Sequence, residues 1–118
     1  MRDAFHEELD AIQATLVTMG EMVELAMARS TASLLNADIK LAETVISDDS
    51  KLDEIQHDLE ARAINLMARQ QPVAQDLRIL VTSLRMSADL ERMGDLCHHI
   101  AKLARMRYPN NAVPSELR

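Results

Sequence analysis

Apolar and small residues in the first third of the chain recur at alternating steps of four and three positions. They are Phe5, Leu9, Ile12, Leu16, Met19, Val23, Ala26 and Ser30. This period predicts a long amphipathic helix over about residues 3–36. Gly20 lies within it and costs about 1 kcal/mol relative to Ala, too little to end so strong a pattern. Asn36 suits the end of this helix, and Asp38 suits the cap of the next.

A second apolar stripe extends to about Ala68 and predicts a second helix. Its members are Leu41, Val45, Leu52, Ile55, Leu59 and Leu66. Four polar residues, Ser47 to Ser50, interrupt the stripe, and we expect the helix to continue through them. Pro72 ends the segment, because proline disfavours helix in the residue before it and suits the first turn of a new helix.

A third stripe predicts a helix from Val73 to about Arg107. It consists of Leu77, Leu80, Leu84, Met86, Leu90, Met93, Cys97, Ile100 and Ala104. Pro109 and Pro114 follow, so we expect the tail 109–118 to be frayed. Short links between three long helices predict an all-α, antiparallel up-down-up three-helix bundle over residues 1–108. Its core is expected to include Leu16, Val23, Leu52, Leu59, Leu80, Leu84 and Ile100.

Composition agrees with this fold and narrows the function. Two Gly and three Pro leave too little turn chemistry for a β-rich protein, while 47% hydrophobic and 27% charged residues are close to a globular average. The net charge of −6 argues against nucleic-acid binding. No segment approaches the roughly 18 consecutive apolar residues of a membrane span, no signal-peptide pattern occurs, and a single Cys permits no internal disulfide. We therefore expect a cytoplasmic protein.

The sulfur-containing residues are expected in the core. Cys97 lies in the third stripe, which favours a buried small hydrophobe over a nucleophile. The methionines at helical spacing are expected to fill the core and not to bind metal: Met19, Met22, Met27, Met86 and Met93.

Polar residues follow two of the stripes by one position. In the second helix they are Asp53, Gln56 and Glu60. In the third helix Glu91 and Asp95 stand four residues apart, and His99 follows four residues later. Carboxylates on adjacent turns are neighbours and repel one another, and a multivalent cation would turn that repulsion into coordination.

The sequence therefore predicts a metal site, although a solvated charged face is the alternative. The expected ligands are Glu91, Asp95, His99, Asp53 and Glu60, with His98 and Gln56 as weaker candidates. Iron, manganese, zinc or magnesium suits such a mostly oxygen-lined site. No motif for an organic cofactor is present.

Several runs of residues resemble the PhoU family of phosphate-uptake regulators. They are Gln71-Pro72-Val73-Ala74-Gln75-Asp76-Leu77-Arg78, then Ala88-Asp89-Leu90-Glu91-Arg92-Met93-Gly94-Asp95, and Ile100-Ala101. In the second helix, Leu52-Asp53, Ile55-Gln56 and Leu59-Glu60 sit where that family places an acidic motif.

The resemblance implies a helical, non-catalytic negative regulator of phosphate transport and phosphate homeostasis. It implies partners, the ATPase of the phosphate ABC transporter and a sensor histidine kinase, and Glu/Asp-x-x-x-Asp motifs that bind metal. Glu91 and Asp95 match that motif. Gln56 and Glu60 match it less well, so Asp53 is the better ligand, and His99 replaces the usual Asn or Asp.

Family members carry two bundles, whereas 118 residues hold one. The tail 109–118 is then alternatively the start of a linker to a second repeat, and two chains are expected to pair as a dimer that rebuilds the missing half. Two other functional classes stay open. One is a carboxylate-bridged metalloenzyme similar to di-iron bundles, although only one Asp-x-x-His, Asp95 to His98, is present. The other is a plain helical oligomerisation module.

Overall fold

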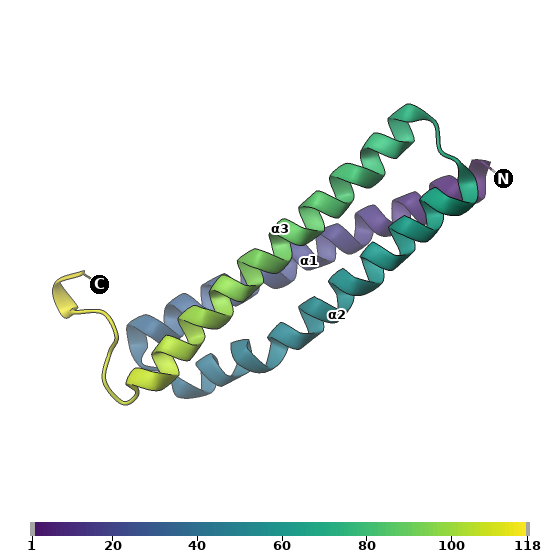
Figure 1. Ribbon diagram of the computed structural model, residues 1–118. Helices are drawn as coiled ribbons and strands as arrows, with labels where there is room; N and C mark the ends of the chain where they lie inside the picture. The colour runs from purple at the N-terminus through teal and green to yellow at the C-terminus, as the bar shows by residue number, and fades with distance from the viewer. Residues whose placement is uncertain (1, 118) are drawn as a thin grey trace.

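Three long helices form an antiparallel up-down-up bundle in the computed structural model, which confirms the predicted fold (Figure 1). They are α1 (Arg2–Asn36), α2 (Ile39–Gln70) and α3 (Ala74–Arg107). The bundle is a rod with extents of 58 × 23 × 16 Å, and each helix contacts both others. α2 runs without a break through the polar stretch 47–50, as predicted.

The structure describes the backbone of residues 2–117 and the side chains of residues 4–117. Beyond α3 the tail contains one short 3-10 helix, η1 (Ser115–Leu117). Arg118, the last residue of the predicted frayed tail, lies outside the described residues.

Asp38 both closes α1 and begins α2. Its backbone N–H donates to the Ser33 carbonyl at 3.1 Å, and its side chain accepts from the Leu41 N–H at 3.1 Å. Ala37, between the two helices, has a φ of 51° and reverses the chain. The predicted cap therefore lets a link of two residues join antiparallel helices.

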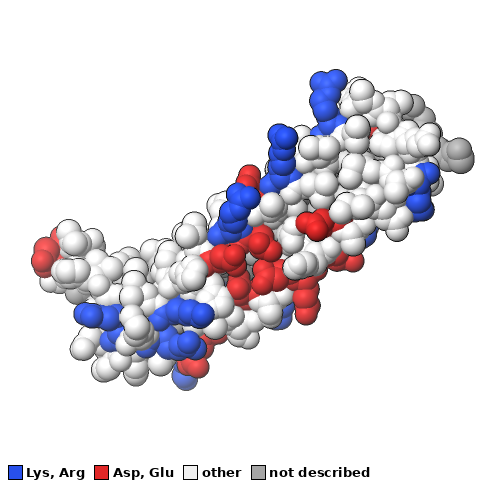
Figure 2. Space-filling view, viewed as in Figure 1, with Lys and Arg blue, Asp and Glu red and all other residues white. Residues whose placement is uncertain are grey.

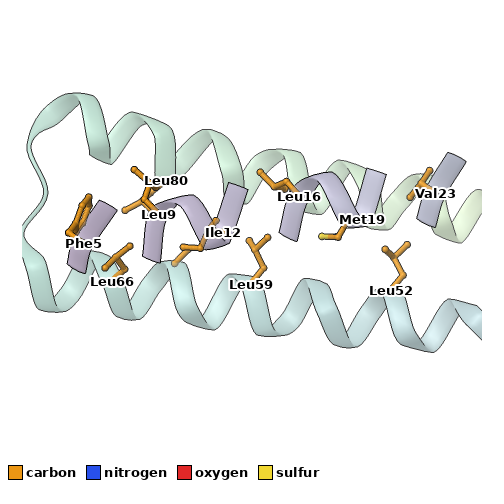
Figure 3. Packing of buried hydrophobic residues seen from close by; sticks show 11 residues of the cluster. Phe5, Leu9, Ile12, Leu16, Met19, Val23, Leu52, Leu59, Leu66 and Leu80 are labelled. Atoms are coloured by element: carbon orange, nitrogen blue, oxygen red, sulfur yellow. The ribbon is translucent and has the colours of Figure 1, made fainter. Parts of the chain in front are cut away.

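Large apolar side chains from all three helices fill one half of the rod (Figure 3). The buried members are Phe5, Leu9, Ile12, Leu16, Met19, Val23, Leu52, Leu59, Ala63, Leu66 and Leu80. Smaller residues fill the other half, namely Ala42, Val45, Cys97, Ala101 and Ala104. Cys97 is fully buried as predicted, and burial raises the pKa of its thiol above the ordinary value.

The buried face of α3 is rotated from the predicted stripe. Ser83, Ser87 and Gly94 are buried, while Leu84 and Ile100, expected in the core, are only half-buried. The hydroxyls of Ser83 and Ser87 donate to carbonyls of their own helix at 2.8 Å, so their burial leaves no unpaired donor. Small residues occupy this buried face because they let α3 approach its neighbours closely.

The prediction that all five methionines fill the core is wrong for three of them. Met27, Met86 and Met93 are 38%, 48% and 42% exposed, whereas Met19 is fully buried. Since α3 turns small residues inward, Met86 and Met93 face outward from the bundle. No helix among residues 2–117 is both long enough and apolar enough to cross a membrane.

Leu59→Ala is expected to lower the free energy of unfolding by about 2–5 kcal/mol, because Leu59 is fully buried among large apolar side chains. Urea denaturation followed by circular dichroism measures this loss. Leu96→Ala is the matched control, because Leu96 is 59% exposed. Equal stability of the two variants would contradict the assignment of Leu59 to the core.

Candidate metal centre

Acidic side chains gather between α2 and α3 in the middle of the rod (Figure 2). Asp49 and Asp53 of α2 and Asp95 of α3 each offer a carboxylate oxygen, and these oxygens all lie within 4.8 Å of one another. We refer to these three residues as the acidic group. Their separation allows a single cation to contact all three carboxylates.

Helical periodicity and one close helix contact bring the acidic group together. Asp49 and Asp53 are four residues apart and therefore share one face of α2. Leu52, beside Asp53, is buried against α3 at Gly94, the residue directly before Asp95. The contact between Leu52 and Gly94 thus sets the two aspartates of α2 opposite the aspartate of α3.

His98 adds a nitrogen donor at the edge of the acidic group. Its Nδ1 lies 2.7 Å from Asp49 Oδ2, and both side chains are mostly buried. An ionised carboxylate can only accept, so Nδ1–H donates this bond. In the neutral ring Nε2 then carries a lone pair, and this buried atom has no hydrogen-bond partner among the described residues.

Burial and mutual repulsion raise the pKa values of two carboxylates at this site. Burial raises the pKa of Asp53 above its ordinary value of 3.8, and the charges of Asp49 and Asp95 raise it further, against smaller lowering effects of His57 and His98. Burial also raises the pKa of Glu91, followed by the charges of Asp53 and Asp95. Glu91 is therefore electrostatically coupled to the acidic group.

The structure brings together some of the predicted ligands and separates others. Asp53 and Asp95 belong to the acidic group, and Glu91 is coupled to it. Glu60 lies seven residues beyond Asp53, about 10 Å along α2. Its carboxylate accepts a 3.4 Å hydrogen bond from the Gln56 amide.

The two histidines also differ in their surroundings. His98, the weaker candidate, contacts Asp49, whereas His99 is exposed and its ring centroid lies 6.4 Å from that of His98. His99 and Glu60 are not part of the acidic group.

Sequence reasoning missed Asp49. This residue lies in the polar stretch 47–50, which interrupts the apolar stripe and for which the sequence predicts only a continuous helix. A signal was nevertheless present, because Asp49-x-x-x-Asp53 has the same spacing as Glu91-x-x-x-Asp95. The spacing alone does not show which turn of α2 lies opposite Asp95.

The donors present fit a metal ion. Three carboxylate oxygens within 4.8 Å match the preference of hard divalent cations for oxygen. Raised pKa values show that Asp53 and Glu91 lack enough positive charge nearby to offset repulsion and burial. A bound cation would supply that charge.

Comparison with known proteins places this bundle in a family. Residues 16–104, which include every residue of the acidic group, match the family profile described as PhoU domain. The chain belongs to the PhoU family. The resemblance noted in the sequence is thereby confirmed.

Individual relatives agree over nearly the whole chain. The chain is 45% identical over 117 residues to "Phosphate-specific transport system accessory protein PhoU homolog 2" of Mycobacterium tuberculosis, covering 99% of this chain and 55% of that protein. It is 41% identical over 118 residues to PhoU homolog 1 of the same species, covering 53% of that protein. A PhoU homolog of Rhizobium meliloti is 43% identical over 99 residues, covering 84% of this chain and 42% of that protein. The chain therefore spans about half the length of these PhoU relatives.

Asp53→Asn is expected to stabilise the metal-free PhoU domain at pH 7, because it removes a charge that is partly desolvated by burial and that Asp49 and Asp95 repel. A carboxyl group whose pKa is raised by folding contributes stability below its unfolded-state pKa and loses it as pH rises through the folded-state pKa. The advantage of the variant is therefore expected to be absent near pH 3.5 and to grow toward pH 7.

Urea denaturation with a chelator, at both pH values, measures this difference. Asp10→Asn removes the same charge from an exposed site on α1 and serves as the control. A variant less stable than wild type at pH 7 would contradict the repulsion.

Proposed function

We propose that this domain belongs to a negative regulator of phosphate uptake and phosphate-starvation signalling. Its role is that of a non-catalytic adaptor between the phosphate ABC transporter and a sensor histidine kinase. Membership of the PhoU family supports this role, as do the names of its relatives, which describe accessory proteins of a phosphate-specific transport system. The action is expected in the cytoplasm, where the ATPase of such a transporter works.

The acidic group is the observation that supports metal binding as part of this proposal. Asp49, Asp53 and Asp95 would hold a divalent or trivalent ion, with Glu91 and His98 beside them. Oxygen donors favour magnesium, manganese or iron, and the free Nε2 of His98 also suits zinc. Such an ion would supply positive charge that offsets the repulsion among these carboxylates.

No arrangement among the described residues favours catalysis over this regulatory role. The di-iron class needs a Glu from each of two helices and a Glu-x-x-His motif from each of two more. Here the acidic group is built by two helices, α2 and α3, and the histidine that is hydrogen-bonded to it, His98, donates to Asp49. The domain thus has the donors of a metal-stabilised docking surface.

Metal binding is tested by titration calorimetry with Mn²⁺. Wild-type domain is expected to bind, and Glu91→Gln combined with Asp95→Asn is expected to lose binding, because two negative charges disappear while the shape is kept. Glu54→Gln combined with Asp58→Asn is the matched control, since it removes the same residue types at the same spacing from an exposed part of α2. Equal affinity in all three proteins would leave the acidic group a solvated face.

Binding is also expected to weaken below about pH 5, because protons compete with the cation for carboxylates. The raised pKa values of Asp53 and Glu91 move this loss toward higher pH than for ordinary carboxylates.

The regulatory role is tested with the same variants in a bacterial host that lacks its own PhoU protein. A full-length protein containing the wild-type domain is expected to repress a phosphate-starvation reporter in phosphate-rich medium. The Glu91→Gln, Asp95→Asn protein is expected to fail, and the Glu54→Gln, Asp58→Asn protein to repress normally. Absence of repression by the wild-type protein, at normal expression, would contradict the regulatory role.

We further propose that the isolated domain pairs with a second copy through a groove between α1 and α3. This α1–α3 groove of about 870 Å³ is lined by apolar Val17, Met86 and Leu90 among others. Arg78 and Arg85 are exposed along α3. Three acidic residues are exposed along α1, namely Asp10, Glu21 and Glu24. A two-fold axis along the rod lays α1 of one copy over α3 of the other and pairs these opposite charges.

Light scattering at tens of micromolar is expected to show a dimer of the wild-type domain. Met86→Lys places a charge in the groove and is expected to give monomers. Met106→Lys, at a site that is 73% exposed near the end of α3, is expected to leave the dimer intact. A wild-type monomer would contradict the pairing.

A further inference from the structure

Gly94 lies at the tightest point between α2 and α3. It is buried on α3, and a Cβ added there would overlap Leu52 Cδ2 and would lie 3.8 Å from Leu52 Cγ. The same Cβ would lie 3.7 Å from Asp49 Oδ1. The Leu52 side chain therefore packs directly on the backbone of α3, with no side chain between.

The other glycine of the chain shows that this closeness is particular to Gly94. A Cβ added at Gly20, in the middle of α1, meets no heavy atom within 4 Å. Both glycines sit inside long helices, where glycine is a poor helix former. Only at Gly94 does the packing require the absence of a side chain.

We propose that Gly94 is a positioning residue for the acidic group, an inference that rests on the proposed metal binding. Asp49 precedes Leu52 by three residues, Asp53 follows it directly, and Asp95 follows Gly94 directly. The contact of Leu52 with Gly94 thus lies between the donors of α2 and the donor of α3. Its closeness is what brings oxygens from both helices within 4.8 Å.

Leu52 has little freedom to rotate toward the core, although a cavity of about 110 Å³ is lined by Leu52 and Gly94. Leu52 is 4% exposed and belongs to the core that contains Met19, Val23 and Leu59. We expect a methyl group at position 94 to push α2 and α3 apart locally, because the core residues on the other side of Leu52 resist displacement. Asp49 and Asp53 then move away from Asp95.

Gly94→Ala is expected to weaken Mn²⁺ binding in calorimetry by about tenfold or more, the range known for supporting residues outside the ligand shell of a metal site. Gly20→Ala makes the same chemical change in open space and is expected to keep the wild-type affinity. Wild-type affinity in Gly94→Ala would overturn the positioning role.

A second-site variant separates positioning from general destabilisation. Leu52→Ala removes the atoms that a Cβ at position 94 would overlap, at the expense of core packing. Combined with Gly94→Ala, it is expected to bring Mn²⁺ affinity back to within about twofold of Leu52→Ala alone. A loss of affinity that merely followed stability would instead be worse in the double variant. Affinity in the double variant that is more than about twofold weaker than in Leu52→Ala alone would overturn the proposal.

Urea denaturation without metal gives an independent readout. Gly94→Ala is expected to lower the unfolding midpoint when Leu52 is present and to leave or raise it when residue 52 is Ala, because Ala is the better helix former. Equal effects in both backgrounds would show no steric contact and would overturn the proposal. A wild-type domain that binds no Mn²⁺ would overturn the metal function, and the positioning role with it, while this stability cycle still reports the contact. These outcomes distinguish failure of the proposed metal binding from failure of the positioning role of Gly94.

Discussion

The packing of Leu52 on the bare backbone of α3 at Gly94 is the contact on which the acidic group depends. Three amphipathic helices bury their stripes by many side-chain contacts, most of which tolerate a small shift along the rod. A side chain that contacts a backbone directly, at a residue without Cβ, tolerates such a shift poorly. The contact therefore fixes which turn of α2 lies opposite Asp95.

The acidic group opposes the stability of the bundle that holds it. Burial and mutual repulsion raise the pKa of Asp53 and of Glu91, so these carboxylates favour separation of α2 and α3 at neutral pH. Large buried residues in the adjacent half of the rod oppose that separation. A strained arrangement of like charges, held by a packed core, is suited to respond to a cation, because binding removes the repulsion.

α3 has different chemistry on its two flanks. Toward α2 it presents Asp95, Glu91 and His98, and toward α1 it lines the α1–α3 groove with Met86 and Leu90. Apart from Leu80, its buried face is made of small residues, and Met86, Met93 and Leu96 are exposed. In this PhoU-family domain, one helix thus joins an acidic flank to a groove lined by apolar residues.

The sequence by itself determined the three helices, the cap at Asp38, the antiparallel bundle and the acidic character of α2 and α3. Each of these follows from local periodicity, cap chemistry or short links, which are encoded by neighbouring residues. The family was also recognisable, since Glu91 to Asp95 lies within a continuous motif. Only the tertiary structure decided the buried face of α3 and the partnership of Asp49 with Asp95. Both depend on the register between α2 and α3, which is set by the contact of two residues 42 positions apart, Leu52 and Gly94, and not by any repeat within one helix.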